Sequence, residues 1–189
     1  NTSFSEYNYL SNNVLITTNK CYSLVFDINE VPITGIKSSG VKAINLKEDY
    51  VTNGTIFDDS YEYITIVTNK GTAKRVKISD VEKTNRARRG VLILREVKTN
   101  PHRLVRSLII NTKETFGVKT NDSLLTFKNS ELPIMDRYST GSNIAKNIEE
   151  VFEIKVLKTV EEPEKEVSLE DVDQKMMTIS DFLKNFNEE

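Results

Sequence analysis

The sequence has little of what builds small metal or disulfide sites. Its 189 residues include one cysteine, one histidine and no tryptophan. A lone Cys21 cannot form an internal disulfide bond, and Cys21 and His102 together are too few ligands for a structural zinc ion. We therefore expect no metal site, and we interpret Cys21 as a turn residue and His102 as a loop residue.

Three further absences narrow the function. No apolar run approaches the ~18 to 20 residues of a membrane helix, and no secretory amino terminus is present, so we expect a cytoplasmic protein with no membrane partner. The seven glycines are dispersed, which excludes a glycine-rich phosphate loop. No nucleophile motif accompanies His102. The sequence therefore predicts no catalytic residue and no cofactor within this chain.

What the sequence does contain is a repeat. The triplet Thr18-Asn19-Lys20 returns as Thr68-Asn69-Lys70, and Gly40-Val41 returns as Gly90-Val91, both at an offset of 50. A third copy follows at an offset of 51, with Gly141 in the place of Gly90. Three copies in register indicate a repeat architecture.

Each copy is predicted to form four short strands. In the first copy, β-branched and apolar runs predict strands at 14–17, 24–28, 40–46 and 50–57, with a hairpin turn at Asn19-Lys20. Four strands per fifty residues are typical of propeller blades. We therefore predict an all-β fold with three four-stranded blades at about 13–62, 63–113 and 114–160, in which neighbouring blades stack to bury their apolar faces.

The chain changes character after residue 160. Residues 161–189 hold three Lys/Arg against ten Asp/Glu, and they begin with an acidic, proline-containing linker. Beyond it, Ile179, Phe182, Leu183 and Phe186 have helical spacing. The sequence leaves three alternatives open for this acidic tail: a short docked helix, disorder, or a partner-binding segment.

Positive charge is concentrated in the middle repeat. Residues 63–113 contain thirteen Lys/Arg and three Asp/Glu, a balance of +10, while every other segment is net negative. Cations confined to one blade repel one another unless an anion is present. Arginine grips phosphate through two parallel hydrogen bonds, and such contacts need not read bases.

The charge contrast predicts sequence-independent binding and bending of duplex DNA. The residues that we expect to contact the backbone lie on the predicted 75–77 strand and in the loop that precedes Gly90, and they are Arg75, Lys77, Lys83, Arg86, Arg88 and Arg89. Aromatic residues are not interleaved with these cations, which disfavours single-stranded DNA or RNA.

Three runs resemble a known family. They are 86–103 (RARRGVLILREVKTNPHR), 26–32 (FDINEVP) and 39–47 (SGVKAINLK). Together they look like the carboxy-terminal domain of the A subunit of bacterial topoisomerase IV, of Gram-positive type, which is related to the equivalent domain of gyrase. The resemblance covers about 14–158.

The resemblance implies a β-pinwheel, a propeller-like ring whose blades exchange strands, with five or six blades in the family. We therefore expect the chain to be a fragment. The implied role is to bind and bend the DNA segment that is transported during ATP-dependent decatenation and relaxation.

The implied enzyme is a type IIA topoisomerase, an isomerase associated with the nucleoid. Its catalytic tyrosine lies in an amino-terminal part of the same polypeptide. ATP and magnesium belong to other parts of the heterotetramer, which includes the B subunit. The gyrase box glutamine-arginine-arginine-glycine-glycine-lysine-glycine is absent, and 86–90 is at best its remnant, which disfavours gyrase-like wrapping.

Two other functions stay open at this stage. The basic blade could dock an acidic protein surface, which would make the chain a protein-interaction propeller. The acidic tail, with its balance of -7, could also fold back over the basic blade and compete with DNA.

Overall fold

The computed structural model describes residues 12–154. The predicted acidic tail lies outside the described residues. Within them the regular structure consists of strands and three short 3-10 turns, which confirms the all-β prediction. The strands are β1 (Asn13–Thr18), β2 (Tyr22–Asp27), β3 (Val51–Phe57), β4 (Tyr63–Thr68), β5 (Thr72–Lys77), β6 (Val91–Leu92), β7 (Leu104–Leu108), β8 (Thr115–Thr120), β9 (Leu124–Lys128), β10 (Ser142–Asn143) and β11 (Ile148–Ile154). The turns are η1 (Ile28–Glu30), η2 (Ile78–Asp80) and η3 (Asn129–Glu131). No helix of this part of the chain is long and apolar enough to cross a membrane.

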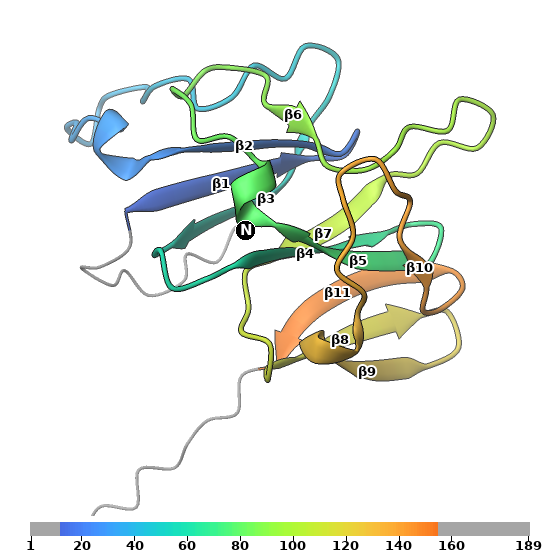
Figure 1. Ribbon diagram of the computed structural model, residues 1–189. Helices are drawn as coiled ribbons and strands as arrows, with labels where there is room; N and C mark the ends of the chain where they lie inside the picture. Colours follow the sequence, from blue (N-terminus) through green and yellow to red (C-terminus); the bar gives the residue numbers. More distant parts are fainter. Residues whose placement is uncertain (1–11, 155–189) are drawn as a thin grey trace, which may run out of the picture. The chain divides into compact units, whose positions relative to one another are not determined.

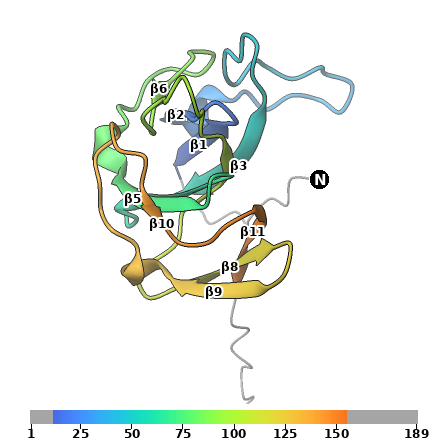
Figure 2. The same ribbon diagram turned by 90° about the vertical axis from the view of Figure 1, so that its right-hand side faces the viewer.

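The strands form three antiparallel sheets, which are seen one after another in Figure 1. The first has the order β3-β1-β2-β6, the second β7-β4-β5-β10, and the third β11-β8-β9. Strand β6 belongs to the second repeat and β10 to the third, so each of the first two sheets receives its fourth strand from the repeat that follows (Figure 2). This exchange is the pinwheel arrangement that the resemblance implied.

One predicted strand is wrong. Residues 40–46 were expected to form a strand like their neighbours, but they have no regular structure. Their equivalents β6 and β10 are strands only because they pair with the edge of the preceding sheet. The described residues include no sheet that precedes the first, and they provide no fourth strand for the third sheet.

The hairpin turns confirm the repeat. The amide of Cys21 donates to Thr18 O at 2.9 Å, and the amide of Gly71 donates to Thr68 O at 3.0 Å. Both turn residues have positive φ, 65° and 79°. The third turn, at Asn121-Asp122, is closed by a 2.9 Å bond from the amide of Thr120 to Ser123 O. Cys21 is therefore a turn residue, as its sequence position predicted.

Two apolar clusters hold the sheets together. One lies between the first and second sheets and includes Leu15, Val25 and Ile64, and the other lies between the second and third and includes Leu108 and Phe116. The inner strands are buried along most of their length, as in β4. Their β-branched and apolar residues, rather than a clean alternation, suit a sheet that is covered on both faces.

Candidate nucleic-acid interface

The loop that carries most of the predicted cations is anchored at both ends to the first sheet. Lys83 forms a β-bridge with Val25, and the amide of Thr84 donates to Val25 O at 2.9 Å. The chain then leaves the sheet and returns at Gly90 (φ 80°), where a Cβ would lie 2.2 Å from Ser23 O. Only glycine fits this approach. Residues 84–90 are thus a short projection with fixed ends.

Arg86 and Ala87 bind this projection to the connection of the first repeat. The Arg86 amide donates to Glu30 Oε2 at 2.9 Å, its Nε to Glu30 O at 3.0 Å, and its Nη1 to Lys42 O at 2.8 Å. The amide of Ala87 donates to Ala43 O at 2.6 Å. Arg86 is half-buried, and two of its five side-chain N–H groups are bonded to backbone carbonyls of the first repeat.

The next two arginines differ in their surroundings. Arg89 is half-buried, with its guanidinium carbon 3.9 Å from the centroid of the Tyr22 ring and Nη1 donating to Leu46 O at 3.3 Å. Arg88 is exposed, and within the described residues its side chain makes no hydrogen bond or ion pair. Both line an open surface depression of about 470 Å³. The structure thus places one unoccupied arginine on a loop that its two neighbours hold in position.

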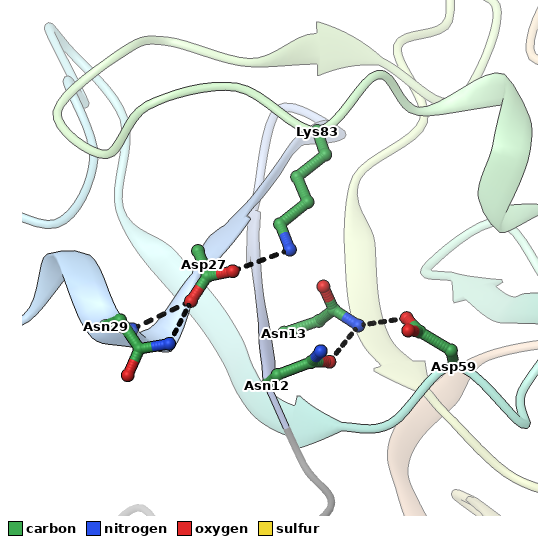
Figure 3. Close-up of polar contacts among 6 residues, drawn as sticks. All are labelled: Asn12, Asn13, Asp27, Asn29, Asp59 and Lys83. Carbon is green, nitrogen blue, oxygen red and sulfur yellow. Dashed lines mark hydrogen bonds and ion pairs between the residues drawn. The ribbon is translucent and has the colours of Figure 1, made fainter.

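Lys83 lies at the base of the loop and is paired. Its Nζ donates to Asp27 Oδ2 at 2.9 Å (Figure 3). The backbone amide of Asn29 also donates to Asp27, and this bond, together with Lys83, holds the pKa of the Asp27 carboxyl below its usual value. Both side chains of the pair are partly exposed, so an outside anion could compete for the lysine.

Of the two β5 cations that were predicted to contact DNA, the fold buries Arg75 and exposes Lys77. Arg75 is 8% exposed; its Nε donates to Leu132 O at 2.9 Å, and its guanidinium carbon lies 5.2 Å from the Tyr63 ring centroid. It therefore holds the third repeat and does not face an outside anion. Lys77, two residues on, is exposed and lines an open cleft of about 610 Å³ whose rim also includes Asp59 and Glu82.

Lys74 is a structural residue that the sequence reasoning counted only as charge. Its side chain is 0% exposed, and Nζ donates to Asp136 O at 2.5 Å, Ser139 O at 2.9 Å and Ser139 Oγ at 3.1 Å. Burial lowers its pKa to about 8. The repeat held the signal, because Lys74 aligns with Leu24 and Leu125, which are apolar. Because Lys74 and Arg75 are both buried, two of the thirteen cations of the second repeat do not contribute to its exposed positive charge.

The exposed cations of the second repeat include Lys77, Lys83 and Arg88, described above, and four more. These four are Lys70, Arg95, Lys98 and Lys113. Asn69, which precedes Lys70, is bonded to Arg103: the Asn69 amide donates to Arg103 O at 2.9 Å, and the Arg103 amide donates to Asn69 Oδ1 at 2.9 Å. This surface can bind an extended anion at several points.

The Cys21 thiol and the His102 ring both contact neighbouring residues of the protein. Burial raises the pKa of the Cys21 thiol to about 12, so it stays protonated. Burial, followed by the charge of Lys70, lowers the pKa of His102, whose Nδ1 lies 3.3 Å from Thr72 Oγ1. Within residues 12–154 no group of three His, Cys, Asp or Glu side chains could hold a metal ion.

Comparison with known proteins finds a family model and relatives that match part of this chain. A family model described as DNA gyrase C-terminal domain, beta-propeller, matches residues 12–53 and 62–111. The A subunit of DNA topoisomerase 4 from Bacillus subtilis (strain 168) is 40% identical over 131 residues, which cover 68% of this chain and 16% of that protein. The chain therefore spans less than a fifth of that relative.

Two solved structures share the fold. The crystal structure of the C-terminal domain of DNA topoisomerase IV matches with a TM-score of 0.73 and 35% identity, over 77% of this chain and 47% of that one. The DNA gyrase A C-terminal domain matches with a TM-score of 0.69 at 16% identity, over 77% of this chain and 51% of that one, which shows the fold alone.

Proposed function

Because the chain belongs to the DNA gyrase C-terminal domain family, we propose that it binds duplex DNA through the phosphate backbone, without reading sequence, and bends it. The observation that carries this proposal is the exposed Arg88 on a loop fixed by its neighbours. Because the neighbours fix the backbone of this loop, Arg88 loses only side-chain entropy on binding phosphate, whereas an arginine on a mobile loop also loses backbone entropy.

The other exposed cations of the second repeat extend the contact. Lys83 lines the same depression as Arg88, and Lys77 and Lys83 line the neighbouring cleft. Contacts spread over a repeat favour a duplex that follows the surface, and following a curved surface requires bending. Arg75 is left out of the proposed contact because its donors are used inside the protein.

Within a whole enzyme, this activity would present the DNA segment to be transported. The relative is named as part of a topoisomerase, so we place the chain in the larger, DNA-cleaving polypeptide of a type IIA topoisomerase, an isomerase that works with ATP and a B subunit. The catalytic steps would lie in the part of that polypeptide that this chain does not span.

The test is the affinity of the chain for a linear duplex at low salt. The variant combines Arg88→Ala with Lys77→Ala, and the matched control is Lys128→Ala, an exposed lysine of the third repeat. We expect the double variant to bind more weakly and to lose about 0.9 from the log–log salt slope for each phosphate contact removed. The control should leave both values unchanged.

Two outcomes would contradict the proposal. An unchanged affinity in the double variant would remove Arg88 and Lys77 from the interface. An absence of duplex binding in the parent chain, with nuclease-resistant capture of an acidic protein, would favour the protein-interaction function. Bending is read separately, from the energy transfer between dyes at the two ends of a short duplex.

A further inference from the structure

One acidic residue contacts the loop that carries Arg88. Glu30, the last residue of η1, accepts the backbone amide of Arg86 through Oε2 at 2.9 Å and the Arg86 Nε through its main-chain oxygen at 3.0 Å. Arg86 lies two residues before the exposed Arg88. A carboxylate in contact with an anion-binding loop opposes the anion by its charge. Its presence at this position therefore needs a reason other than charge.

The equivalent carboxylate of the second repeat makes no such contact. By the offset of 50 it is Asp80, which is exposed, and its side chain forms no hydrogen bond or ion pair within residues 12–154. Arg137, the equivalent of Arg86, does donate from Nη1 to the preceding connection, at Leu92 O and 3.3 Å. The arginine bond is thus common to both loops, while the bond from a loop amide to a carboxylate belongs to the loop of Arg88.

The backbone next to the Glu30 contact also differs between the two loops. Ala87 has a φ of 63°, in the left-handed region that residues other than glycine seldom adopt, and its equivalent Tyr138 has no positive φ. Such a conformation persists only where surrounding contacts hold it. Here the Arg86 amide is bonded to Glu30, and the Ala87 amide is bonded to Ala43 O at 2.6 Å. Glu30 therefore supplies one of the bonds that hold the left-handed turn.

The residue that follows this turn is exposed in one loop and turned inward in the other. Arg88 is exposed, whereas its equivalent Ser139 is half-buried. The Ser139 Oγ accepts from Lys74 Nζ at 3.1 Å and donates to Asp136 O at 3.2 Å. The left-handed Ala87 thus accompanies an arginine that faces solvent, in place of a serine that faces the protein.

We infer that Glu30 is a positioning residue for the DNA contact. Its carboxylate oxygen fixes the Arg86 amide, and through the left-handed Ala87 this bond holds Arg88 toward the phosphate backbone. The inference rests on the proposed function, because the phosphate contact of Arg88 is what Glu30 positions. Glu30 acts as a hydrogen-bond acceptor and not through its charge, so an acidic residue here favours the binding of a polyanion.

The test compares two substitutions of Glu30 in the affinity of the 189-residue chain for a linear duplex at low salt. Glu30→Gln removes the charge but keeps an oxygen that can accept from the Arg86 amide, so it should bind at least as tightly as the parent chain. Glu30→Ala removes both, and it should bind about threefold or more weakly. Charge alone predicts the opposite sign for Glu30→Ala, since the loss of a carboxylate favours an anion. Asp80→Ala, the matched control for a lost carboxylate, should not weaken binding.

A double-mutant cycle separates positioning from a general loss of stability. In a chain that already carries Arg88→Ala, Glu30→Ala should cause no further weakening, because the side chain that Glu30 positions is gone. A general loss of folding would instead weaken binding in both backgrounds alike. The salt dependence gives a second measurement: Glu30→Ala should lower the log–log slope toward the Arg88→Ala value, by up to about 0.9.

The outcomes distinguish this inference from the proposed function. If Arg88→Ala weakens binding while Glu30→Ala binds as tightly as the parent chain, or more tightly, the inference alone is overturned. Equal weakening by Glu30→Ala in the two backgrounds would also overturn it. If Arg88→Ala itself leaves the affinity and the slope unchanged, the proposed phosphate contact fails, and the inference fails with it.

Discussion

The two junctions between sheets share one plan but are held by different cations. In the first, Arg86 Nη1 donates to Lys42 O at 2.8 Å, and in the second the equivalent Arg137 Nη1 donates to Leu92 O at 3.3 Å. Each arginine ties a loop to the connection before it. This tie is common to both junctions, so it belongs to the scaffold and not to the basic character of the second repeat.

The two junctions differ in the buried residue of the accepting strand that lies against the loop. At the first junction the position of Leu24 is apolar and packs with Ile44 and Phe26, while at the second the equivalent Lys74 reaches three oxygens of the loop above it. Cations that look alike in a charge count therefore have two roles. Lys74 and Arg75 hold the second junction from inside, whereas the first junction leaves Arg88 exposed.

The largest expected effect is on the first junction. Gly90→Ala combines a positive φ of 80° with a Cβ 2.2 Å from Ser23 O. We expect the free energy of unfolding to fall by about 2–5 kcal/mol, from left-handed strain and overpacking, measured by urea denaturation. Gly141→Ala should cost less, because its Cβ would lie 2.9 Å from the nearest atom. Gly35→Ala, with open space and no positive φ, is the control; equal losses at all three would show that close approach does not matter.

The second junction should depend on Lys74. Lys74→Ala leaves a cavity and removes the Nζ donor from the carbonyl oxygens of Asp136 and Ser139, which keep only the longer 3.2 Å bonds from Ser139 Oγ and the Arg95 amide. We expect a loss of about 2–4 kcal/mol in the free energy of unfolding, reduced from the full cavity cost because a buried charge is also removed.

Two variants make this result specific. Lys77→Ala removes an exposed lysine from the same strand and should change the free energy of unfolding by less than about 0.5 kcal/mol. Lys74→Leu introduces the residue found at position 24 and should lie between the other two, since it fills the volume but donates nothing. A fully stable Lys74→Leu chain would show that the apolar and ionic junctions are interchangeable.

Lys74 also predicts a pH dependence. Its folded pKa of about 8 lies below the ordinary 10.5, so above pH 8 the unfolded chain binds a proton that the folded chain has released. The contribution of Lys74 to the free energy of unfolding therefore rises with pH between about 8 and 10.5, by up to about 1.4 kcal/mol per pH unit. Urea titrations from pH 7.5 to 10 should show this rise as a difference between the parent chain and Lys74→Met. Parallel curves for the two chains would contradict it.

The repeat made much of the fold predictable. The offsets of 50 and 51 located the hairpin turns and the glycines at 40, 90 and 141, because the same backbone conformation recurs in each repeat. The exchange of β6 and β10 followed from the family resemblance only, since periodicity shows that a segment is extended but not which sheet it joins. For that reason residues 40–46 were wrongly predicted as a strand.

The candidate site was predictable in location but not in detail. Counting charge found the loop before Gly90, yet it could not separate Arg88, which is exposed, from Arg86, which is half-buried and bonded through Nε and Nη1 to backbone carbonyls. Hydrogen bonds to main-chain oxygens leave no mark in the sequence. The alignment of Lys74 with two leucines was a sign in the sequence that this cation is buried.

The smallest expected effect concerns the exposed pair at the base of the loop. Lys83→Ala removes one of the groups that lower the pKa of Asp27, while the Asn29 amide remains. The Asp27 pKa should therefore rise but stay below its ordinary value, as read from the carboxyl carbon in an NMR titration. The sign follows from linkage: the stability that the pair contributes is present at neutral pH and is lost as the pH falls through the folded pKa of Asp27. Because both partners are solvent-exposed, the urea midpoint at neutral pH should not move measurably. A clear drop in the midpoint would mean that the Lys83–Asp27 pair stabilises the first junction, as Lys74 stabilises the second.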